Sequence, residues 1–191
     1  MYNIKNKQEI HMNPIIIGLC GPSGSGKSTV ARALSEELNC EVFCADRYFK
    51  SELPKMISPD DGNEYPDWNS PESINYKALA DDVKAYVENC DKKYVIIEGS
   101  LIFAVELIDS MLDLRIFVTA KPETCIYRRI VRNISLMGQS AEYIGSYYLK
   151  CARHREAQYC LPCIKKADIV IDNDVSFDKD LKAVVKRIRS L

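Results

Sequence analysis

The sequence predicts an α/β fold in which one five-stranded parallel sheet carries helices on both faces. Five short segments rich in β-branched residues are almost entirely apolar, which is typical of strands buried on both faces. Helical patterns lie between these segments, and strands that alternate with helices form parallel sheets. A glycine-rich segment with one lysine follows the first strand, at the edge where such sheets bind ligands.

The expected elements alternate regularly along the chain. The strands are predicted at Ile15–Cys20, Glu41–Ala45, Tyr94–Gly99, Leu114–Thr119 and Asp168–Asp172. The helices are predicted at Ser28–Leu38, Ile74–Asn89, Ile102–Met111, Pro122–Ile134, Tyr143–Leu161 and Lys179–Ser190. We expect the second strand to lie beside the first, joined to it by a right-handed crossover.

Length and composition favour one compact domain. The chain has 191 residues, of which 47% are hydrophobic, and a net charge of −1. We predict a single domain at 14–191, preceded by an N-terminal extension at 1–13. The small net charge provides no basic field for nucleic acid or an anionic membrane. Because the extension lacks the apolar core of a signal peptide, we expect a cytoplasmic protein.

Two irregular segments are candidates for function. Residues 51–73 form a long stretch that holds four of the eight prolines, and loops of that length in a compact domain are usually functional. We predict a substrate loop there. Residues 128–142 combine the end of a helix with a break at Gly138, and we predict that they form a lid.

The segment GPSGSGKST, residues 21–29, matches the phosphate-binding pattern Gly-x4-Gly-Lys-Ser. Its glycines let backbone N–H groups point at phosphate oxygens, and the following helix adds its positive N-terminus. Lys27 would supply a charge to the β- and γ-phosphates, and Ser28 would hold Mg²⁺. The candidate nucleotide-binding residues are Gly21, Ser23, Gly24, Ser25, Gly26, Lys27, Ser28 and Thr29. Position between a strand and a helix favours a P-loop NTPase fold over a plain glycine-rich turn.

Two carboxylates follow predicted strands. Glu98 is the only acid on its strand and can bind Mg²⁺ directly or through water; the alternative is a solvated strand-end acid. Asp46 follows the second strand, at the expected mouth of the phosphate loop. Phosphorylation of a hydroxyl needs a group that accepts its proton, and Asp46 is the best candidate. The alternative is a helix cap or a partner of Arg47.

Three arginines cluster in the segment TCIYRRIVRN. Arg128 and Arg132 share one helix face at spacing i, i+4, and Arg129 points in a second direction. Such a helix can close over a transferring phosphoryl group and supply cationic donors. The alternative is an ordinary solvated basic face, and the break at Gly138 favours the lid.

The eight cysteines are scattered, mostly in apolar patterns where a thiol behaves as a small hydrophobe. Cys151, His154, Cys160 and Cys163 have the spacing C-x2-H-x5-C-x2-C, which is compatible with a zinc site. The stretch reads as one continuous helix that runs to Pro162, which favours packing thiols and a surface histidine.

Four motifs occur in order along the chain: GPSGSGKST, DRYFK, IIEGSLIF and RRIVRNIS. Together they resemble the uridine kinase-like family of small P-loop kinases, which includes uridine–cytidine kinases and nicotinamide riboside kinases. The likeness spans roughly residues 15–172, where DWNSPESIN is similar to the family's substrate-loop segment. The resemblance implies a nucleoside/nucleotide kinase-like three-layer sandwich that uses ATP and Mg²⁺. It also implies phosphorylation of the 5′-hydroxyl of a nucleoside such as uridine or cytidine, or of a nucleoside-like riboside.

The resemblance also implies roles for matching residues. Lys27 and the loop amides would hold the phosphates, Ser28 and Glu98 would hold Mg²⁺, and Asp46 would act as the base. The lid arginines would be Arg129 and Arg132. The acceptor-binding residues would be Asp46, Phe49, Asp67 and Asn69.

Three features depart from the family pattern. Asn69 stands where the family usually has an acid that binds the ribose hydroxyls, and an amide bonds a diol without charge assistance. Asp67, two residues earlier, is the candidate substitute. Met137 and Gln139 flank the lid glycine in place of arginines, and the pair Tyr48-Phe49 reverses the usual order.

Other functions stay open at this point. A kinase for another small alcohol, sugar or vitamin precursor would use the same chemistry. A nucleotide-binding protein without acceptor kinase activity is the alternative from a different class. The expected partners are ATP and a nucleoside-like acceptor, and the cysteines and tyrosines are compatible with a homo-oligomer.

Overall fold

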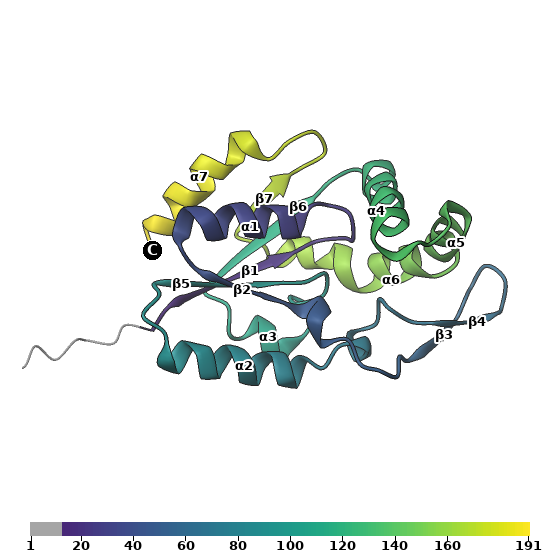
Figure 1. The fold of residues 1–191 in the computed structure, drawn as a ribbon, viewed down its shortest axis with the longest axis horizontal. Coiled ribbons are helices and arrows are strands. Elements are labelled where there is room, and N and C mark those ends of the chain that lie inside the picture. The colour runs from purple at the N-terminus through teal and green to yellow at the C-terminus, as the bar shows by residue number, and fades with distance from the viewer. Residues whose placement is uncertain (1–12) are drawn as a thin grey trace, which may run out of the picture.

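Five parallel strands form the central sheet of the computed structural model, which describes residues 13–191 (Figure 1). In chain order the strands are β1 Ile15–Cys20, β2 Glu41–Cys44, β5 Tyr94–Glu98, β6 Leu114–Thr119 and β7 Ile169–Asp172. Across the sheet their order is β2-β5-β1-β6-β7. The predicted five-stranded parallel sheet is confirmed. The extension predicted at 1–13 falls, apart from Asn13, outside the described residues.

The second strand lies next to β5 rather than next to β1, so its predicted position was wrong. β5 pairs with β2 on one side and with β1 on the other. Every residue of β5 is buried, whereas β2 is partly exposed, as suits an edge strand. A right-handed crossover fixes the hand of a connection but does not fix how many strands the connection passes.

Helices cover both faces of the sheet, as predicted. They are α1 Lys27–Leu38 and α7 Asp178–Arg189 on one face, and α2 Tyr76–Asn89 and α3 Glu106–Asp109 on the other. Successive side chains of a strand point to opposite faces. Ile96 therefore packs in the core beneath α1 and α7, while its neighbour Ile97 packs in the core beneath α2 and α3.

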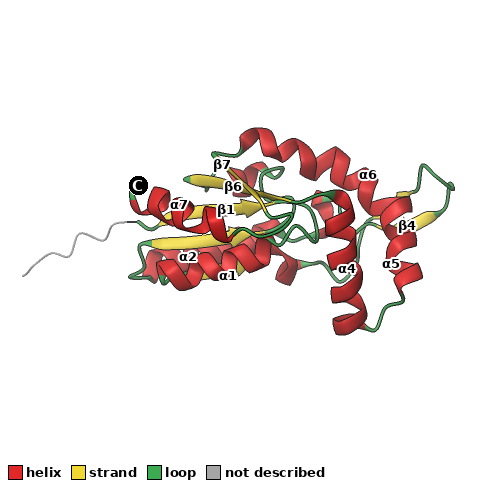
Figure 2. Ribbon diagram, turned by 90° about the horizontal axis from the view of Figure 1, so that it is seen from above, coloured by secondary structure: helices red, strands yellow, loops and turns green. Residues whose placement is uncertain are grey.

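A helical arm, residues 122–166, begins after β6 at the carboxyl edge of the sheet, and its last part returns along the face covered by α2 and α3. It contains α4 Pro122–Met137, α5 Ala141–Tyr147, the π-helical segment Tyr148–Ala152, α6 Arg153–Arg155, the π-helical segment Glu156–Cys160 and the 3₁₀ segment Leu161–Lys166. Figures 1 and 2 show α4 and α5 at the end of the molecule farthest from the C-terminus. Gly138 ends α4 with a φ of 64°, a left-handed conformation that favours glycine.

The helix predicted at 102–111 is much shorter in the structure. Only α3, Glu106–Asp109, is α-helical there. Ile102 and Phe103 are fully buried in the preceding turns, and Lys166 Nζ donates a hydrogen bond of 2.7 Å to the Phe103 carbonyl. Burial of these side chains beneath the sheet holds the backbone in a turn, although the local pattern favours a helix.

The segment predicted as an irregular substrate loop contains a small β-hairpin. Its strands are β3 Lys55–Ile57 and β4 Glu64–Pro66, which pair antiparallel. Each strand has three residues, too few for an alternating pattern to be visible in the sequence.

Within residues 13–191, no helix is long and apolar enough to cross a membrane.

Candidate active site

A glycine-rich loop joins β1 to α1 at the carboxyl edge of the sheet. Gly26 lies immediately before α1 with a φ of 91°, and Gly24 has a φ of 90°. A Cβ atom on Gly24 would lie 2.2 Å from the carbonyl oxygen of Cys125 in α4. Both the backbone conformation and the close approach require glycine. The loop leads into a helix N-terminus, where backbone N–H groups favour an anion.

Asn173 supports the loop from the end of the edge strand β7. It directly follows β7, and its Nδ2 donates a hydrogen bond of 2.8 Å to the Ser25 carbonyl. Arg128 in turn donates to the carbonyl of Asn173 at 2.9 Å. Sequence reasoning missed Asn173, and the available signal was a polar residue directly after a strand. Arg128 therefore supports the loop from outside and does not share a site with Arg132.

Lys27, Ser28 and Glu98 meet behind the loop. The Ser28 hydroxyl donates a hydrogen bond of 3.0 Å to Glu98 Oε1. Lys27 is buried, which by itself lowers its pKa, but the carboxylates of Glu98 and Asp46 outweigh that effect and the pKa of Lys27 is raised. Lys27 therefore keeps its positive charge. The Ser28 hydroxyl and the Glu98 carboxylate are hard oxygen donors of the kind that fits Mg²⁺.

A cavity of about 380 Å³ opens in front of the loop. Its wall includes Ser23 of the loop and Asp46, which lies on a short 3₁₀ turn after β2. The rings of Phe49 and Trp68 form an aromatic part of the wall, with centroids 5.2 Å apart at 76°. The cavity thus connects a candidate base to the phosphate loop, and its size and aromatic wall suit a small ring-bearing ligand.

Two of the arginines on α4 line the same cavity. They are Arg129 and Arg132. Arg132 Nη2 lies 3.5 Å from the Ser23 hydroxyl, and its Nε donates to Asn133. Arg132 therefore lies beside the loop that would hold phosphates, and both arginines share the cavity with Asp46.

Arg129 is partly buried next to Glu156, an acid that the sequence analysis did not select. Burial lowers the pKa of Arg129, and Glu156 opposes this shift. Burial likewise raises the pKa of Glu156, against the effect of Arg129 and of the Ser23 backbone amide. Neither Arg129 Nη1 nor Glu156 Oε1 has a hydrogen-bond partner among the described residues. The sequence did contain a sign of this: Glu156 lies four residues after Ala152 and four before Cys160, so it is an acid on the apolar face of the helix.

The predicted acceptor residues separate into two groups. Phe49 and Asn69 line the cavity together with Asp46, and Asn69 Oδ1 is buried without a partner among residues 13–191. Asp67 does not line the cavity. Its carboxylate accepts hydrogen bonds from Arg155 Nε at 2.7 Å and from the Asn69 backbone at 3.1 Å. Asp67 thus shapes the loop, and Asn69 belongs to the cavity wall.

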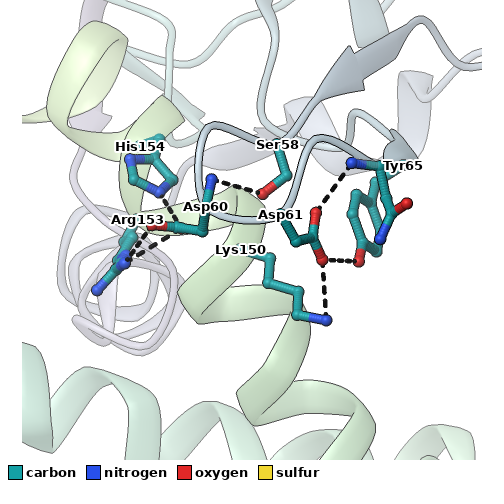
Figure 3. Close-up of polar contacts among 8 residues, drawn as sticks. Ser58, Asp60, Asp61, Tyr65, Lys150, Arg153 and His154 are labelled. Atoms are coloured by element: carbon teal, nitrogen blue, oxygen red, sulfur yellow. Dashed lines mark hydrogen bonds and ion pairs between the residues drawn. The ribbon is translucent and has the colours of Figure 1, made fainter.

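The tip of the β3–β4 hairpin is tied to the helical arm by two aspartates (Figure 3). Asp60 accepts a hydrogen bond of 3.1 Å from Arg153 and lies 2.6 Å from His154 Nε2. Asp61 lies 3.0 Å from Lys150 Nζ. These side chains are partly exposed, so each pair alone contributes little, but together they fix the direction of the hairpin.

The four residues with zinc-like spacing do not come together. Cys151 packs with Met56, whereas Cys160 and Cys163 belong to the core beneath α2 and α3. His154 is paired with Asp60. Within the part of the chain that the structure describes, no group of three or more His, Cys, Asp or Glu side chains is arranged to hold a metal. The zinc alternative is therefore not supported.

Comparison with known proteins identifies the family. Residues 17–142 match a family model described as an AAA domain. The chain belongs to the AAA domain family. Within this AAA domain, the matched residues extend from β1 through the phosphate loop and α4 to the start of α5. The P-loop NTPase fold predicted from the sequence is confirmed.

Curated relatives of this AAA domain protein include several bacterial uridine kinases. The uridine kinase of Chlamydia pneumoniae is 26% identical over 182 residues, which cover 82% of this chain and 81% of the relative. That of Ligilactobacillus salivarius is 29% identical and covers 93% of both chains. That of Bacillus subtilis is 27% identical and covers 87% of this chain and 91% of the relative. The resemblance inferred from the motifs is confirmed.

Two solved structures share the fold. An uncharacterized protein from Eubacterium ventriosum superimposes with a TM-score of 0.55 at 17% identity, covering 93% of this chain and 99% of its own. A protein from Thermus thermophilus gives a TM-score of 0.50 at 21% identity, covering 94% and 98%. At these identities the likeness supports the fold alone.

Proposed function

We propose that this protein is a kinase that transfers the γ-phosphoryl group of ATP to the 5′-hydroxyl of a nucleoside or a nucleoside-like riboside. The observation that carries the proposal is the cavity that connects Asp46 with the phosphate loop and with Arg129 and Arg132. The uridine kinase relatives support the choice of acceptor class. In this proposal residues 51–73 are the acceptor loop and residues 128–142 are the lid.

The chemistry follows from the positions of these groups. The acceptor hydroxyl would lie beside Asp46, which takes its proton as the new oxygen–phosphorus bond forms and the bond to the leaving ADP breaks. Ser28 and Glu98 would hold Mg²⁺, which supplies charge neutralisation at the phosphates when bound. Lys27 and the lid arginines stabilise negative charge that develops during transfer.

The lid arginines also explain why transfer to water would be limited. Arg129 is largely buried, and Met137, Tyr143 and Ile144 of the lid region complete the cavity wall around it. A wall of this kind excludes water from the transferring group. The acceptor, bound against Phe49, Trp68 and Asn69, would then be the competent nucleophile.

The first test measures ADP release from Mg-ATP with a panel of acceptors and identifies the product by mass spectrometry. The panel contains uridine, cytidine, adenosine, nicotinamide riboside, free sugars and pantothenate, and Lys27→Ala serves as the blank. Turnover with one or more ribonucleosides or ribosides is expected. Turnover only with a sugar or pantothenate would replace the acceptor class. Silence with every acceptor, while ATP still binds, would favour a nucleotide-binding protein without acceptor kinase activity.

A further inference from the structure

Tyr147, the last residue of α5, lies between the acceptor loop and the lid. Its side chain is buried, with 7% of its surface exposed. The hydroxyl donates a hydrogen bond of 3.0 Å to the Pro66 carbonyl and accepts one of 3.2 Å from the Trp68 backbone amide. The ring faces the guanidinium of Arg129, with the Arg129 Cζ 5.7 Å from the ring centroid. One side chain therefore contacts both the acceptor loop and the lid arginine of the proposed site.

The hydroxyl contacts fix the backbone that carries Asn69. Pro66 and Trp68 flank Asp67, whose carboxylate accepts from the Asn69 amide and from Arg155. Burial raises the pKa of Tyr147 to about 12, so the hydroxyl stays protonated and can donate to Pro66 throughout the neutral range. The loop geometry at Asn69 thus depends on a residue of the helical arm.

The ring contact concerns the arginine that would meet the transferring phosphoryl group. Arg129 Nη1 is buried and has no partner among the described residues, so this guanidinium, which lines the cavity, keeps a nitrogen whose donors are unused. A cation over an aromatic face is held by the ring quadrupole, and the interaction gains strength where water is excluded. A shift of Arg129 toward a phosphate would therefore change its contact with the Tyr147 ring.

We propose that Tyr147 is a positioning residue that couples the acceptor loop to the lid arginine Arg129. A phosphoryl group seated on Arg129 favours the loop geometry that Tyr147 holds at Trp68 and Asn69, and an acceptor in the loop favours the engaged Arg129 in return. This coupling rests on the proposed kinase function. Other ties of the loop, the Arg155–Asp67 pair and the hairpin contacts of Figure 3, do not reach Arg129 directly.

Trp68 allows a test without phosphoryl transfer, because it is the only tryptophan in the chain. Its backbone amide bonds Tyr147, and its ring lines the cavity. The emission of Trp68 is recorded with no nucleotide, with Mg-ADP and with the non-hydrolysable analogue Mg-AMP-PNP. In the wild type, AMP-PNP is expected to change the emission beyond the change caused by ADP, because only AMP-PNP reaches Arg129.

Two variants remove the coupling at different points, and one is a matched control. Tyr147→Phe removes the hydroxyl bonds and keeps the ring, and Arg129→Gln removes the cation. Each should abolish the AMP-PNP-specific change, because the change depends on the coupling between the two parts. Tyr127→Phe should keep it, since Tyr127 of α4 is exposed and does not line the cavity. Circular dichroism establishes that each variant is folded. If Tyr147→Phe does not fold, the emission of Arg129→Gln tests the coupling.

Kinetics separate the coupling from a general structural role. In Tyr147→Phe the KM for the best acceptor should rise about 5- to 30-fold, the effect of one or two lost hydrogen bonds, while kcat changes by a smaller factor. A fall of kcat with the KM unchanged would overturn the proposal, as would a wild type whose Trp68 emission does not distinguish AMP-PNP from ADP. If the wild type did not bind AMP-PNP at all, that result would instead contradict the proposed function itself. In that case, acrylamide quenching of Trp68 without nucleotide still tests the loop contact, and equal quenching in Tyr147→Phe and the wild type refutes it.

Discussion

Replacement of Gly24 by alanine should destabilise the protein, whereas the same replacement at Gly145 should stabilise it. At Gly24 the φ is 90°, and the new Cβ would lie 2.2 Å from the Cys125 carbonyl oxygen, 2.9 Å from its carbonyl carbon and 3.0 Å from its Cα. These atoms belong to the backbone of α4 and cannot rotate away. At Gly145, inside α5, a Cβ would meet nothing within 4 Å.

The two glycines therefore predict opposite signs. A left-handed backbone costs an alanine roughly 1–2 kcal/mol, and displacement of the α4 backbone adds to it, so Gly24→Ala should lose about 2–4 kcal/mol of unfolding free energy. Gly145→Ala should gain about 0.5–1 kcal/mol, because glycine is unfavourable inside a helix. For a domain of this size the expected changes in Tm are a fall of about 4–16 °C and a rise of about 1–4 °C.

Urea titration and thermal unfolding monitored by circular dichroism provide the measurement. Gly24→Ala should also weaken ATP binding, because the phosphate loop must shift, whereas Gly145→Ala should not. A Gly24→Ala protein with the Tm of the wild type would refute the reasoning. It would mean that the loop relaxes away from α4 without cost, so that its close contact with Cys125 does not constrain it.

Three further predictions concern single side chains. Asp46→Asn should slow phosphoryl transfer by ~10²-fold or more with ATP affinity nearly intact, in the range of a lost general base; Asp91→Asn is the control, and near-normal turnover would remove Asp46 from the mechanism. Lys27→Ala should weaken ATP binding, measured by calorimetry, and should also slow phosphoryl transfer. If the variant bound ATP and transferred phosphate as the wild type does, Lys27 would not contact the phosphates. Glu156 has a raised pKa in the folded state, so its contribution to stability is complete below the ordinary value of 4.5 and is lost as pH rises through the folded value. The Tm of Glu156→Gln minus that of the wild type should therefore increase as pH rises from about 4 to 8. If this Tm difference stayed constant, Glu156 would ionise as freely in the folded protein as in the unfolded chain.

Local patterns were sufficient to predict most of the fold. The continuous apolar run of β5 indicated a strand buried on both faces, and every one of its residues is buried. The spacing of GPSGSGKST behind β1 predicted the phosphate loop, and the structure has glycines at the positive φ positions that the loop requires. These features depend on neighbours in the sequence, so a single sequence contains their signal.

Features that depend on distant segments were missed. The position of β2 depends on which strand pairs with the free edge of β5, and the residues of β2 alone do not indicate its partner. The turn at Ile102 and Phe103 depends on burial beneath the sheet, and the β3–β4 hairpin depends on its attachment to the helical arm. In each case a contact between segments outweighs the local preference.

The sequence by itself determined the chemistry that is available: a phosphate loop with Lys27 and Ser28, carboxylates at two strand ends, and arginines on one helix. Only the tertiary structure decided which of these groups share a cavity. It separated Arg128 from Arg132, turned Asp67 toward Arg155, and brought Tyr147 and Glu156 to Arg129. The physical reason is that side-chain type is written locally, whereas burial, pairing and direction depend on how strands and helices far apart in the chain pack together.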